Sequence, residues 1–258
     1  MYKIVFFDID GTLLNRRREL PASVIESVEK LQQNGILTAI ATGRTPFNIE
    51  DVLRALRIDT YVVYNGGLLV YQGEIMEQTE INRETLDSIV RRIQAHRHSL
   101  IVNEVNEFSV YTDDLDYVLG SLGKHWNREG MKRFDGIHGP VSQIELYCPF
   151  DEIHEYIDAY PNLTFHPWST GASIFNVIPK GVSKAKGIET IIGRLGIDRE
   201  EVVAFGDGPN DMEMISFAGM GIAMGNAVDE LKEVARLKTR DADDDGIQYA
   251  LQQLGLID

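Results

Sequence analysis

The sequence has little cysteine and no surplus of positive charge, and both shortages exclude classes of protein. Cys148 is the only cysteine among 258 residues, so no internal disulfide can form, which fits a reducing compartment. Aspartate and glutamate number 40 against 25 lysines and arginines, a formal net charge of −15. Nucleic acids and anionic membranes bind basic surfaces, so we expect neither as a partner. A small anionic substrate remains compatible, because a bound cation can reverse the local sign.

Long apolar runs are also missing. No uninterrupted run approaches the roughly 20 residues that a helix needs to span a bilayer. The first strand-like segment begins almost at Met1, leaving no room for a secretory leader, so we expect a cytoplasmic protein. Hydrophobic residues make up 43% of the chain, which is enough for one large or two modest domains with full cores.

Short apolar segments alternate with amphipathic helical patterns over the first eighty residues. Segments 4–7, 36–41 and 61–64 are typical of buried strands, and Pro21 and Pro46 each open a helical pattern. Alternation of strands and helices indicates a parallel α/β sheet. The same pattern returns after residue 181, with a helix over 182–195 and a strand over 202–205.

The pattern between these two stretches is different. Asn82 is placed to cap a long amphipathic helix, and several adjacent strand-like segments follow it. We interpret residues 82–181 as an inserted α+β domain. Residues 1–81 and 182–258 together would then form one α/β core with a Rossmann-like, mostly parallel sheet.

Two carboxylates follow the first strand, in the segment Asp8-Ile9-Asp10-Gly11. Alternate side chains of an extended segment point the same way, so Asp8 and Asp10 would project together. Two such carboxylates are tolerated when a cation lies between them or when one is protonated. They suit Mg²⁺, which retains positions for water and for substrate phosphate oxygens. Taken alone, the pair is more typical of an ordinary acidic turn.

The predicted strands share a feature that weighs against the ordinary turn. Each of four apolar strands ends in a polar cluster, and ligands of open α/β sheets bind outside the carboxyl ends of the strands. If the strands are parallel neighbours, the clusters converge on one site. The clusters are Asp8 with Asp10, Thr42 with Gly43, Asn65 with Gly66, and Asp207 with Asn210 and Asp211.

Individual residues of these clusters have a structural interpretation, such as a helix cap or a solvated side chain, as well as a functional one. Thr42 and Gly43 lead into the Pro46 helix, so they would form an anion site, or Thr42 would be a plain N-cap. Lys184 falls in the first turn of its helix, where the helix dipole disfavours a cation, so it either neutralises an anion or is solvated. Asp211 would serve as a metal-site carboxylate or as a helix cap.

Two further features favour ordinary interpretations. Residues 241–245 hold four carboxylates, but they lack the EF-hand spacing and are more typical of a solvated loop than of a calcium site. Cys148 has no activating partner nearby in the sequence, which favours a packing role over a nucleophilic one.

Four motifs in order resemble those of the haloacid dehalogenase-like hydrolases. Asp8-Ile-Asp-Gly-Thr-Leu matches their first motif, and Thr42-Gly-Arg, Lys184 and Gly206-Asp-Gly-Pro-Asn-Asp look like the second, third and fourth. The insert between the second and third motifs is similar to the class II cap of the Cof-type branch. Gly221-Ile-Ala-Met-Gly-Asn-Ala is also similar to that branch.

The resemblance implies roles for the acidic residues. Asp8 would be the nucleophile that forms an aspartyl-phosphate, and Asp10 would protonate the leaving alcohol and then activate water. Mg²⁺ would be held by Asp8, the Asp10 backbone carbonyl and Asp207. Asp211 would orient a metal-bound water and Lys184.

The resemblance also implies how phosphate is held and what the protein does. The phosphoryl oxygens would be bound by Thr42, Lys184, Asn210 and the backbone N–H groups of Ile9 and Gly43. The expected activity is Mg²⁺-dependent hydrolysis of small phosphorylated metabolites, such as sugar phosphates or phosphorylated cofactors. A phosphomutase of the same superfamily is the alternative enzyme. A phospho-accepting signalling module is the alternative of another class, although the large insert and Asp10 argue against it.

Overall fold

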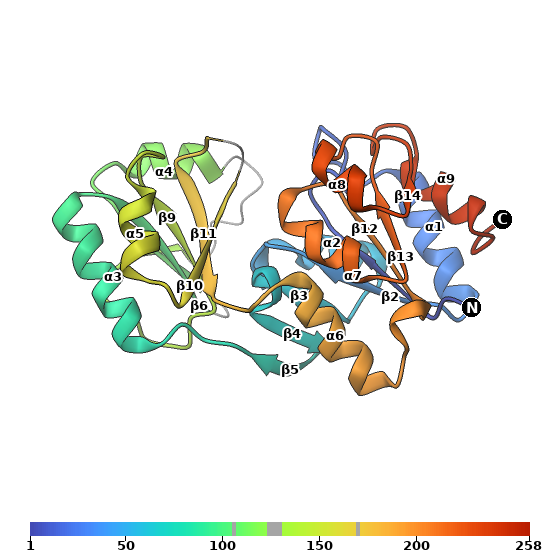
Figure 1. The fold of residues 1–258 in the computed structure, drawn as a ribbon, viewed down its shortest axis with the longest axis horizontal. Coiled ribbons are helices and arrows are strands. Elements are labelled where there is room, and N and C mark those ends of the chain that lie inside the picture. Colours follow the sequence, from blue (N-terminus) through green and yellow to red (C-terminus); the bar gives the residue numbers. More distant parts are fainter. Residues whose placement is uncertain (105–106, 123–130, 169–170) are drawn as a thin grey trace. The chain divides into compact units, whose positions relative to one another are not determined.

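The computed structural model describes residues 1–104, 107–122, 131–168 and 171–258 (Figure 1). The chain forms two compact units. The first comprises Met1–Gly43, Glu50–Glu77 and Ser183–Asp258, and the second comprises Arg44–Ile49 and Gln78–Val182. Residues 44–49, which the sequence pattern places in the core domain, group with the second unit. Within that unit Phe47 stacks on Phe108, with ring centroids 5.5 Å apart.

The first unit is built on an eight-stranded sheet of mixed but mostly parallel strands. The strand order is β14-β13-β12-β1-β2-β3-β4-β5, and every pairing from β14 to β3 is parallel, whereas β3 and β4 are antiparallel. This confirms the expected α/β core. The strands are β1 (Ile4–Phe7), β2 (Leu37–Ala41), β3 (Tyr61–Val63), β4 (Leu68–Tyr71), β5 (Glu74–Gln78), β12 (Val202–Gly206), β13 (Met220–Ala223) and β14 (Leu237–Lys238).

Helices pack on this sheet in two groups. Helices α1 and α9 contact each other, whereas α6, α7 and α8 pack together over a core that includes Ile4, Phe6 and Ile188. The four residues of β1 are fully buried, as the uninterrupted apolar run predicts for a central parallel strand. The helices are α1 (Ala22–Gln33), α2 (Glu50–Leu56), α6 (Lys184–Leu195), α7 (Met212–Phe217), α8 (Asp229–Val234) and α9 (Gly246–Gln253).

The second unit has its own sheet and its own hydrophobic core. Its strand order is β10-β11-β9-β6-β7-β8, antiparallel except for the β7–β8 pair. Helices α3 and α5 share one core cluster with this sheet, and α4 belongs to another. The elements are α3 (Arg83–His96), β6 (Ser99–Glu104), β7 (Glu107–Tyr111), α4 (Leu115–Leu122), β8 (Met131–Arg133), β9 (Gln143–Tyr147), α5 (Ile153–Ala159), β10 (Leu163–Pro167) and β11 (Ile174–Pro179).

The start of α3 and the segment after Pro46 compare differently with the sequence pattern. Asn82 caps α3 as predicted, accepting hydrogen bonds from the backbone N–H groups of Glu84 and Thr85. The single helix expected from Pro46 is instead a 3₁₀ turn, Pro46–Asn48, followed by α2 from Glu50. The α-helix N-terminus expected at Pro46 is therefore replaced by the start of a single 3₁₀ turn. Within the described ranges, no helix has the length and apolar character that crossing a bilayer requires.

Candidate active site

The polar clusters converge because their strands are adjacent and in register. Phe7, the last residue of β1, is paired with Phe205 of β12 on one side and with Ile40 of β2 on the other. Asp8 follows directly, and its backbone N–H donates to the carbonyl of Phe205 at 3.0 Å. The ends of β12, β1, β2 and β3 therefore lie side by side, and the prediction of convergence at one edge of the sheet is confirmed.

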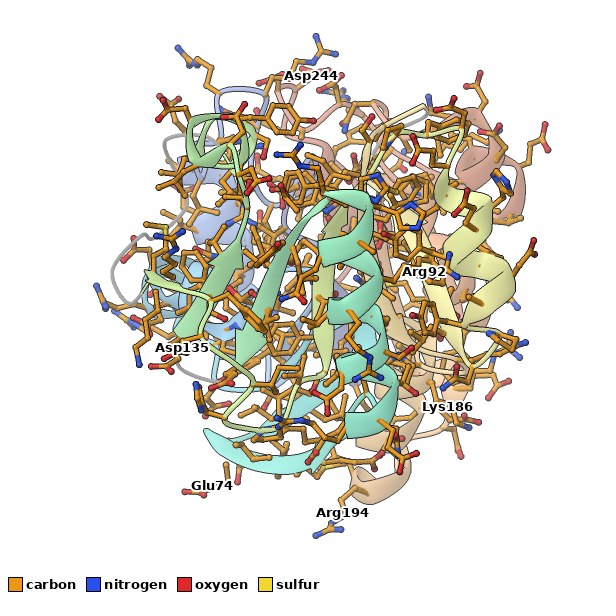
Figure 2. All side chains as sticks on the ribbon, turned by 90° about the vertical axis from the view of Figure 1, so that its left-hand side faces the viewer. Glu74, Arg92, Asp135, Lys186, Arg194 and Asp244 are labelled. Carbon is orange, nitrogen blue, oxygen red and sulfur yellow. The ribbon has the colours of Figure 1, made fainter. Side chains whose placement is uncertain are left out.

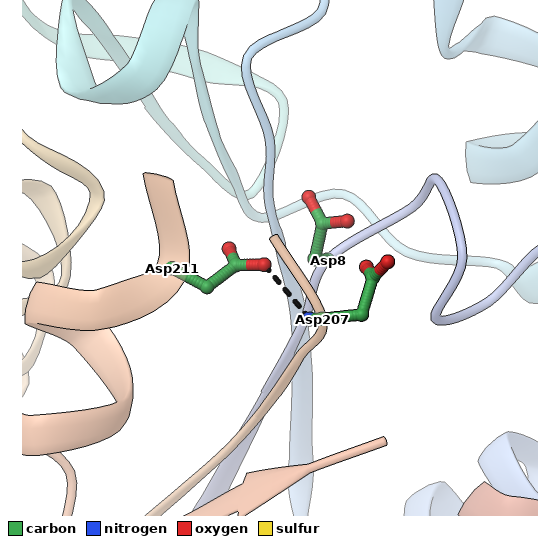
Figure 3. Close-up of side chains that lie close together, drawn as sticks. All are labelled: Asp8, Asp207 and Asp211. Atoms are coloured by element: carbon green, nitrogen blue, oxygen red, sulfur yellow. Dashed lines mark hydrogen bonds between the residues drawn. The ribbon is translucent and has the colours of Figure 1, made fainter. Parts of the chain in front are cut away.

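Three carboxylates gather at this edge. Asp8, Asp207 and Asp211 each offer an oxygen, and these atoms all lie within 4.8 Å of one another (Figure 3). Asp211 is fully buried, and Asp8 is 6% exposed. Asp10 lies at an exposed position after the strand, and its carboxylate is outside this close group. Buried carboxylates this close together need positive charge nearby, because each disfavours ionisation of the others.

Lys184 supplies one positive charge. It is the first residue of α6, it is 1% exposed, and its Nζ lies 2.6 Å from Asp8 Oδ1 and 2.6 Å from Asp211 Oδ1. The helix dipole disfavours a cation at this position, and the two carboxylates offset that cost. The solvated-lysine interpretation is therefore wrong.

The approach of α6 to the sheet depends on a glycine. Gly66 follows β3 with φ of +111°, and a Cβ there would lie 2.3 Å from the carbonyl oxygen of Ser183. Ser183 is the N-cap of α6 and accepts a hydrogen bond from the backbone N–H of Lys186. Only a residue without a side chain allows this turn to contact the start of the helix that carries Lys184.

The pKa values of these groups are strongly perturbed. Burial raises the pKa of Asp8 well above its usual value, Lys184 opposes this, and the neighbouring carboxylates add to it. Burial and the charge of Asp211 raise the pKa of Asp207 to about 7. Burial alone would lower the pKa of Lys184, but Asp211 and Asp8 raise it above its ordinary value, so this lysine is charged. One ammonium against three carboxylates leaves an excess of negative potential, which a further cation would relieve.

The carboxylates differ in how many hydrogen bonds they already accept. Asp211 Oδ2 accepts from the backbone N–H groups of Asp207 and Gly208 at 3.0 and 2.9 Å, and its Oδ1 accepts from Lys184. Its side chain makes no capping bond to α7, but its bond to the Gly208 N–H belongs to a capping box at the 3₁₀ turn Pro209–Asp211. Asp211 is therefore both a cap of that turn and a carboxylate of the site. Asp211 thus anchors the turn and the lysine, and Asp8 and Asp207 retain more of their capacity as oxygen ligands for a hard divalent cation.

The residues expected to hold phosphate are linked through Asn65. Thr42 is buried at the end of β2, and its carbonyl accepts from the backbone N–H of Asn65 at 3.0 Å. The side chain of Asn65 accepts from Asn210 Nδ2 at 2.9 Å. A Cβ on Gly43 would lie 2.9 Å from the amide of Asn65, so these two residues are in direct contact. Ile9 is buried in the turn after β1.

Two residues near Asp207 have no role in the sequence-based prediction. Thr12 Oγ1 donates to Asp207 Oδ1 at 3.1 Å, and Asn226 Nδ2 lies 3.4 Å from Asp207 Oδ2. Both residues lie in the motifs that carry the family resemblance. The motifs therefore mark these residues, but their contacts span 195 and 19 residues of sequence, so no local pattern indicates that Asp207 is their partner.

The sequence was compared with models of known protein families. The family model described as haloacid dehalogenase-like hydrolase matches residues 5–251. The chain belongs to this family. The match includes both halves of the first unit and the second unit between them, so the family assignment covers the site and the insert together.

Relatives and solved structures of this family extend the comparison. The Bacillus subtilis protein YkrA, named as a candidate phosphatase, is 34% identical over 99% of this chain and 98% of its own length. The crystal structure of a hypothetical protein from Geobacillus kaustophilus HTA426 aligns with a TM-score of 0.91 and 39% identity over 100% of both chains. The subclass IIB sugar phosphatase BT4131 aligns with a TM-score of 0.88 and 30% identity over 99% of this chain and 100% of its own. The chain is a phosphoric monoester hydrolase of the haloacid dehalogenase-like type.

Proposed function

We propose that this hydrolase is a Mg²⁺-dependent phosphatase of small phosphorylated metabolites that works through an aspartyl-phosphate on Asp8. Sugar phosphates are the favoured class, because the sugar phosphatase BT4131 aligns over 99% of the chain, and phosphorylated cofactors are the second class to test. The observation that carries the proposal is the buried contact of Lys184 with Asp8 and Asp211 beside Asp207, at the carboxyl ends of parallel strands.

The first chemical step is assigned to Asp8. A carboxylate oxygen of Asp8 attacks phosphorus, the bond from phosphorus to the leaving oxygen breaks, and Asp10 donates a proton to that oxygen. Lys184 favours the ionised form of Asp8 and remains beside the phosphoryl group as a fixed positive charge. Asp10 lies at an exposed position after the strand, where a proton can exchange with solvent.

The second step returns Asp8 to its original state. Asp10 accepts a proton from water, the water oxygen attacks phosphorus, and the bond between Asp8 and phosphorus breaks to release inorganic phosphate. Thr42, Gly43, Lys184, Asn210 and the backbone N–H of Ile9 are proposed to hold the phosphoryl oxygens throughout.

The donor set fits a hard divalent cation. Asp8, Asp207 and the Asp10 backbone carbonyl would hold Mg²⁺, with Asp211 orienting a bound water, and the ion would offset the charge that the carboxylates and the phosphate bring together. The surplus of carboxylates over lysine charge at the site supports this assignment.

The second unit is proposed to act as a cap that selects among substrates. All residues assigned to the phosphoryl chemistry belong to the first unit, and the second unit has a hydrophobic core of its own. We define the cap as residues 82–181. A separately folded block without catalytic groups contributes binding energy from parts of the substrate away from the phosphate.

A panel of phosphorylated metabolites tests the proposal. Wild-type protein with Mg²⁺ should release inorganic phosphate from a subset of sugar or cofactor phosphates, and excess chelator should abolish the release. Return of the phosphoryl group to another position of the substrate would indicate a phosphomutase instead. A stable phosphoprotein without turnover would indicate a phospho-accepting module.

Two substitutions test the assigned roles of the aspartates. Asp8→Asn should remove both turnover and the phosphoenzyme. Asp10→Asn should lower turnover by roughly 10²–10⁴-fold, as expected when general acid–base catalysis is lost. An aryl phosphate, whose leaving group needs little protonation, should lessen the defect of Asp10→Asn in the first step. Near-normal turnover by Asp8→Asn would contradict the choice of nucleophile.

A further inference from the structure

Asn226 joins three separate segments around the carboxylate of Asp207. It follows β13, and its side-chain Nδ2 donates to the carbonyl oxygen of Gly11 at 2.7 Å and lies 3.4 Å from Asp207 Oδ2. Its Oδ1 accepts from the backbone N–H of Ala242 at 3.0 Å. One amide therefore connects the turn after β1, the end of β12 and the segment after β14.

The orientation of this amide is fixed by its backbone partners. The N–H of Ala242 can only donate, so it must face the oxygen of the Asn226 amide. The carbonyl of Gly11 can only accept, so it must face the nitrogen. Exchanging the two ends would place donor against donor and acceptor against acceptor. The NH₂ group is consequently directed toward Gly11 and Asp207.

The segment that holds Asn226 is itself held in place. The backbone N–H of Gly225 donates to the carbonyl of Arg240 at 2.8 Å, and a Cβ on Gly225 would lie 2.5 Å from the backbone nitrogen of Asp241. Gly225 and residues 240–241 are thus in direct backbone contact. This contact limits how far the amide of Asn226 can move.

The Asp207 carboxylate has a side-chain neighbour on each oxygen. Thr12 donates to Oδ1 at 3.1 Å, and Asn226 approaches Oδ2. Gly11 lies against the same carboxylate, because a Cβ there would be 2.2 Å from Asp207 Oδ2. Asn226 therefore contacts both the carboxylate and the turn that immediately follows the Asp10 carbonyl.

We infer that Asn226 is a positioning residue for the metal site, fixing the rotation of the Asp207 carboxylate and the turn that carries the Asp10 carbonyl. The inference rests on the proposed function, which assigns both oxygens to the cation. Residues that hydrogen-bond to metal ligands typically change metal affinity or activity by about 10–100-fold when they are substituted. The role that we assign to Asn226 involves no contact with substrate and no proton transfer.

Two substitutions and one control separate positioning from general stabilisation. Asn226→Ala removes the donor, and Asn226→Asp keeps the size but places carboxylate oxygens against Gly11 and Asp207. Arg16→Ala is the matched control, because Arg16 contacts the same 241–243 segment through ion pairs with Asp241 and Asp243 while remaining 74% exposed. Exposed pairs of this kind contribute little to stability.

The measurement is the Mg²⁺ dissociation constant of the full-length protein, obtained by calorimetry in the absence of substrate. We expect Asn226→Ala to weaken Mg²⁺ binding by about 10-fold or more, Asn226→Asp to weaken it further, and Arg16→Ala to change it less than about twofold. At saturating Mg²⁺, Asn226→Ala should lower kcat for a generic aryl phosphate more than it changes KM. If Asn226→Ala does not fold, the isosteric Asn226→Asp carries the comparison.

The outcomes distinguish this inference from the proposed function. Wild-type affinity for Mg²⁺ in both folded Asn226 variants, with only a lowered melting temperature, would overturn the inference and leave the metal site intact. Wild-type protein that binds no Mg²⁺ would overturn both. A loss in Arg16→Ala equal to that in Asn226→Ala would also overturn the inference, because it would assign the effect to the 241–243 segment as a whole.

Discussion

Lys184 Nζ lies 2.6 Å from Asp211 Oδ1, and neither side chain is exposed to solvent. Asp8 Oδ1 lies at the same distance from the same nitrogen. A buried ammonium is stable only when its lost hydration is replaced by close, hydrogen-bonded anions. Lys184 therefore needs both carboxylates, and they need Lys184, so this contact links the stability of the core to the chemistry at its edge.

Removing Lys184 should impair both stability and activity. Lys184→Ala leaves two buried carboxylates without their counter-charge, which should cost about 3–5 kcal/mol of unfolding free energy. Lys186→Ala is the matched control two residues along α6. Its side chain lies at the surface (Figure 2). It is 65% exposed and pairs with Glu189, so its loss should leave the unfolding free energy close to that of the wild type.

Thermal unfolding and aryl-phosphate turnover, measured on both lysine variants, check this prediction. Lys184→Ala should also bind the phosphoryl group less well, which would lower kcat/KM, whereas kcat/KM of Lys186→Ala should remain near the wild-type value. Similar losses in the two variants would contradict the role assigned to Lys184.

Gly11 should tolerate substitution far less than a glycine with the same backbone conformation elsewhere. Gly11 and Gly35 have φ of +74° and +75°, so alanine introduces comparable backbone strain at both. A Cβ on Gly11 would lie 2.2 Å from Asp207 Oδ2, whereas nothing lies within 4 Å of a Cβ on Gly35. Gly11→Ala should therefore displace the carboxylate and abolish most turnover, and Gly35→Ala should lower only stability, by about 1 kcal/mol. Equal activity in the two variants would argue against tight packing of Gly11 on Asp207.

The sequence predicts the fold well, and it also predicts that the polar clusters meet at one edge of the sheet, because both features depend on local patterns. The uninterrupted apolar run at β1 indicates a central strand, and the polar residues that end four such strands indicate convergence. Contacts that depend on distant segments are not predictable in this way. The solvated alternative for Lys184 could be excluded only once its partners, Asp8 and Asp211, 176 and 27 residues away, were placed.

Two differences from the expected pattern have the same physical origin. The helix expected from Pro46 is interrupted before Glu50, and residues 44–49 belong to the second unit, where Phe47 stacks on Phe108. Residues 131–133 lie in the glycine-rich segment 130–139, whose composition is typical of a loop, but they pair with β7. Gly130 itself lies outside the described residues. In both cases long-range packing overrides a weak local preference.

Glu145 should make the stability of the second unit depend on pH. It is 2% exposed on β9, and it accepts hydrogen bonds from Asn103 Nδ2 at 2.5 Å and Gln143 Nε2 at 3.2 Å, with no cation paired to it in the described chain. Burial raises its pKa to about 7, and the two amides oppose this only partly. The folded state therefore binds a proton more tightly than the unfolded state. Stability is fully present below the unfolded pKa of 4.5 and is lost as the pH rises toward 7.

Glu145→Gln removes this titration. Between pH 5 and 8 wild-type protein should lose up to about 3 kcal/mol of unfolding free energy from this group, and Glu145→Gln should not show that part of the loss. Tryptophan fluorescence is the suitable probe, because both tryptophans of the chain fall within 78–182. The same pH dependence in the two proteins would show that Glu145 ionises without cost in the folded state.

Replacing the proposed cap should separate specificity from chemistry. The two units have separate hydrophobic cores, and every residue assigned to phosphoryl transfer lies in the first, so a short Gly/Ser linker in place of residues 82–181 should leave some hydrolysis of a generic aryl phosphate. Phe47 would lose its stacking partner, so the variant should also carry Phe47→Ser. Discrimination among phosphorylated metabolites should fall by about 10-fold or more, because binding energy away from the phosphate is lost. Circular dichroism and a Mg²⁺-dependent thermal shift establish that the shortened protein is folded. If the folded protein kept the substrate ranking of the full-length enzyme, specificity would reside in the first unit.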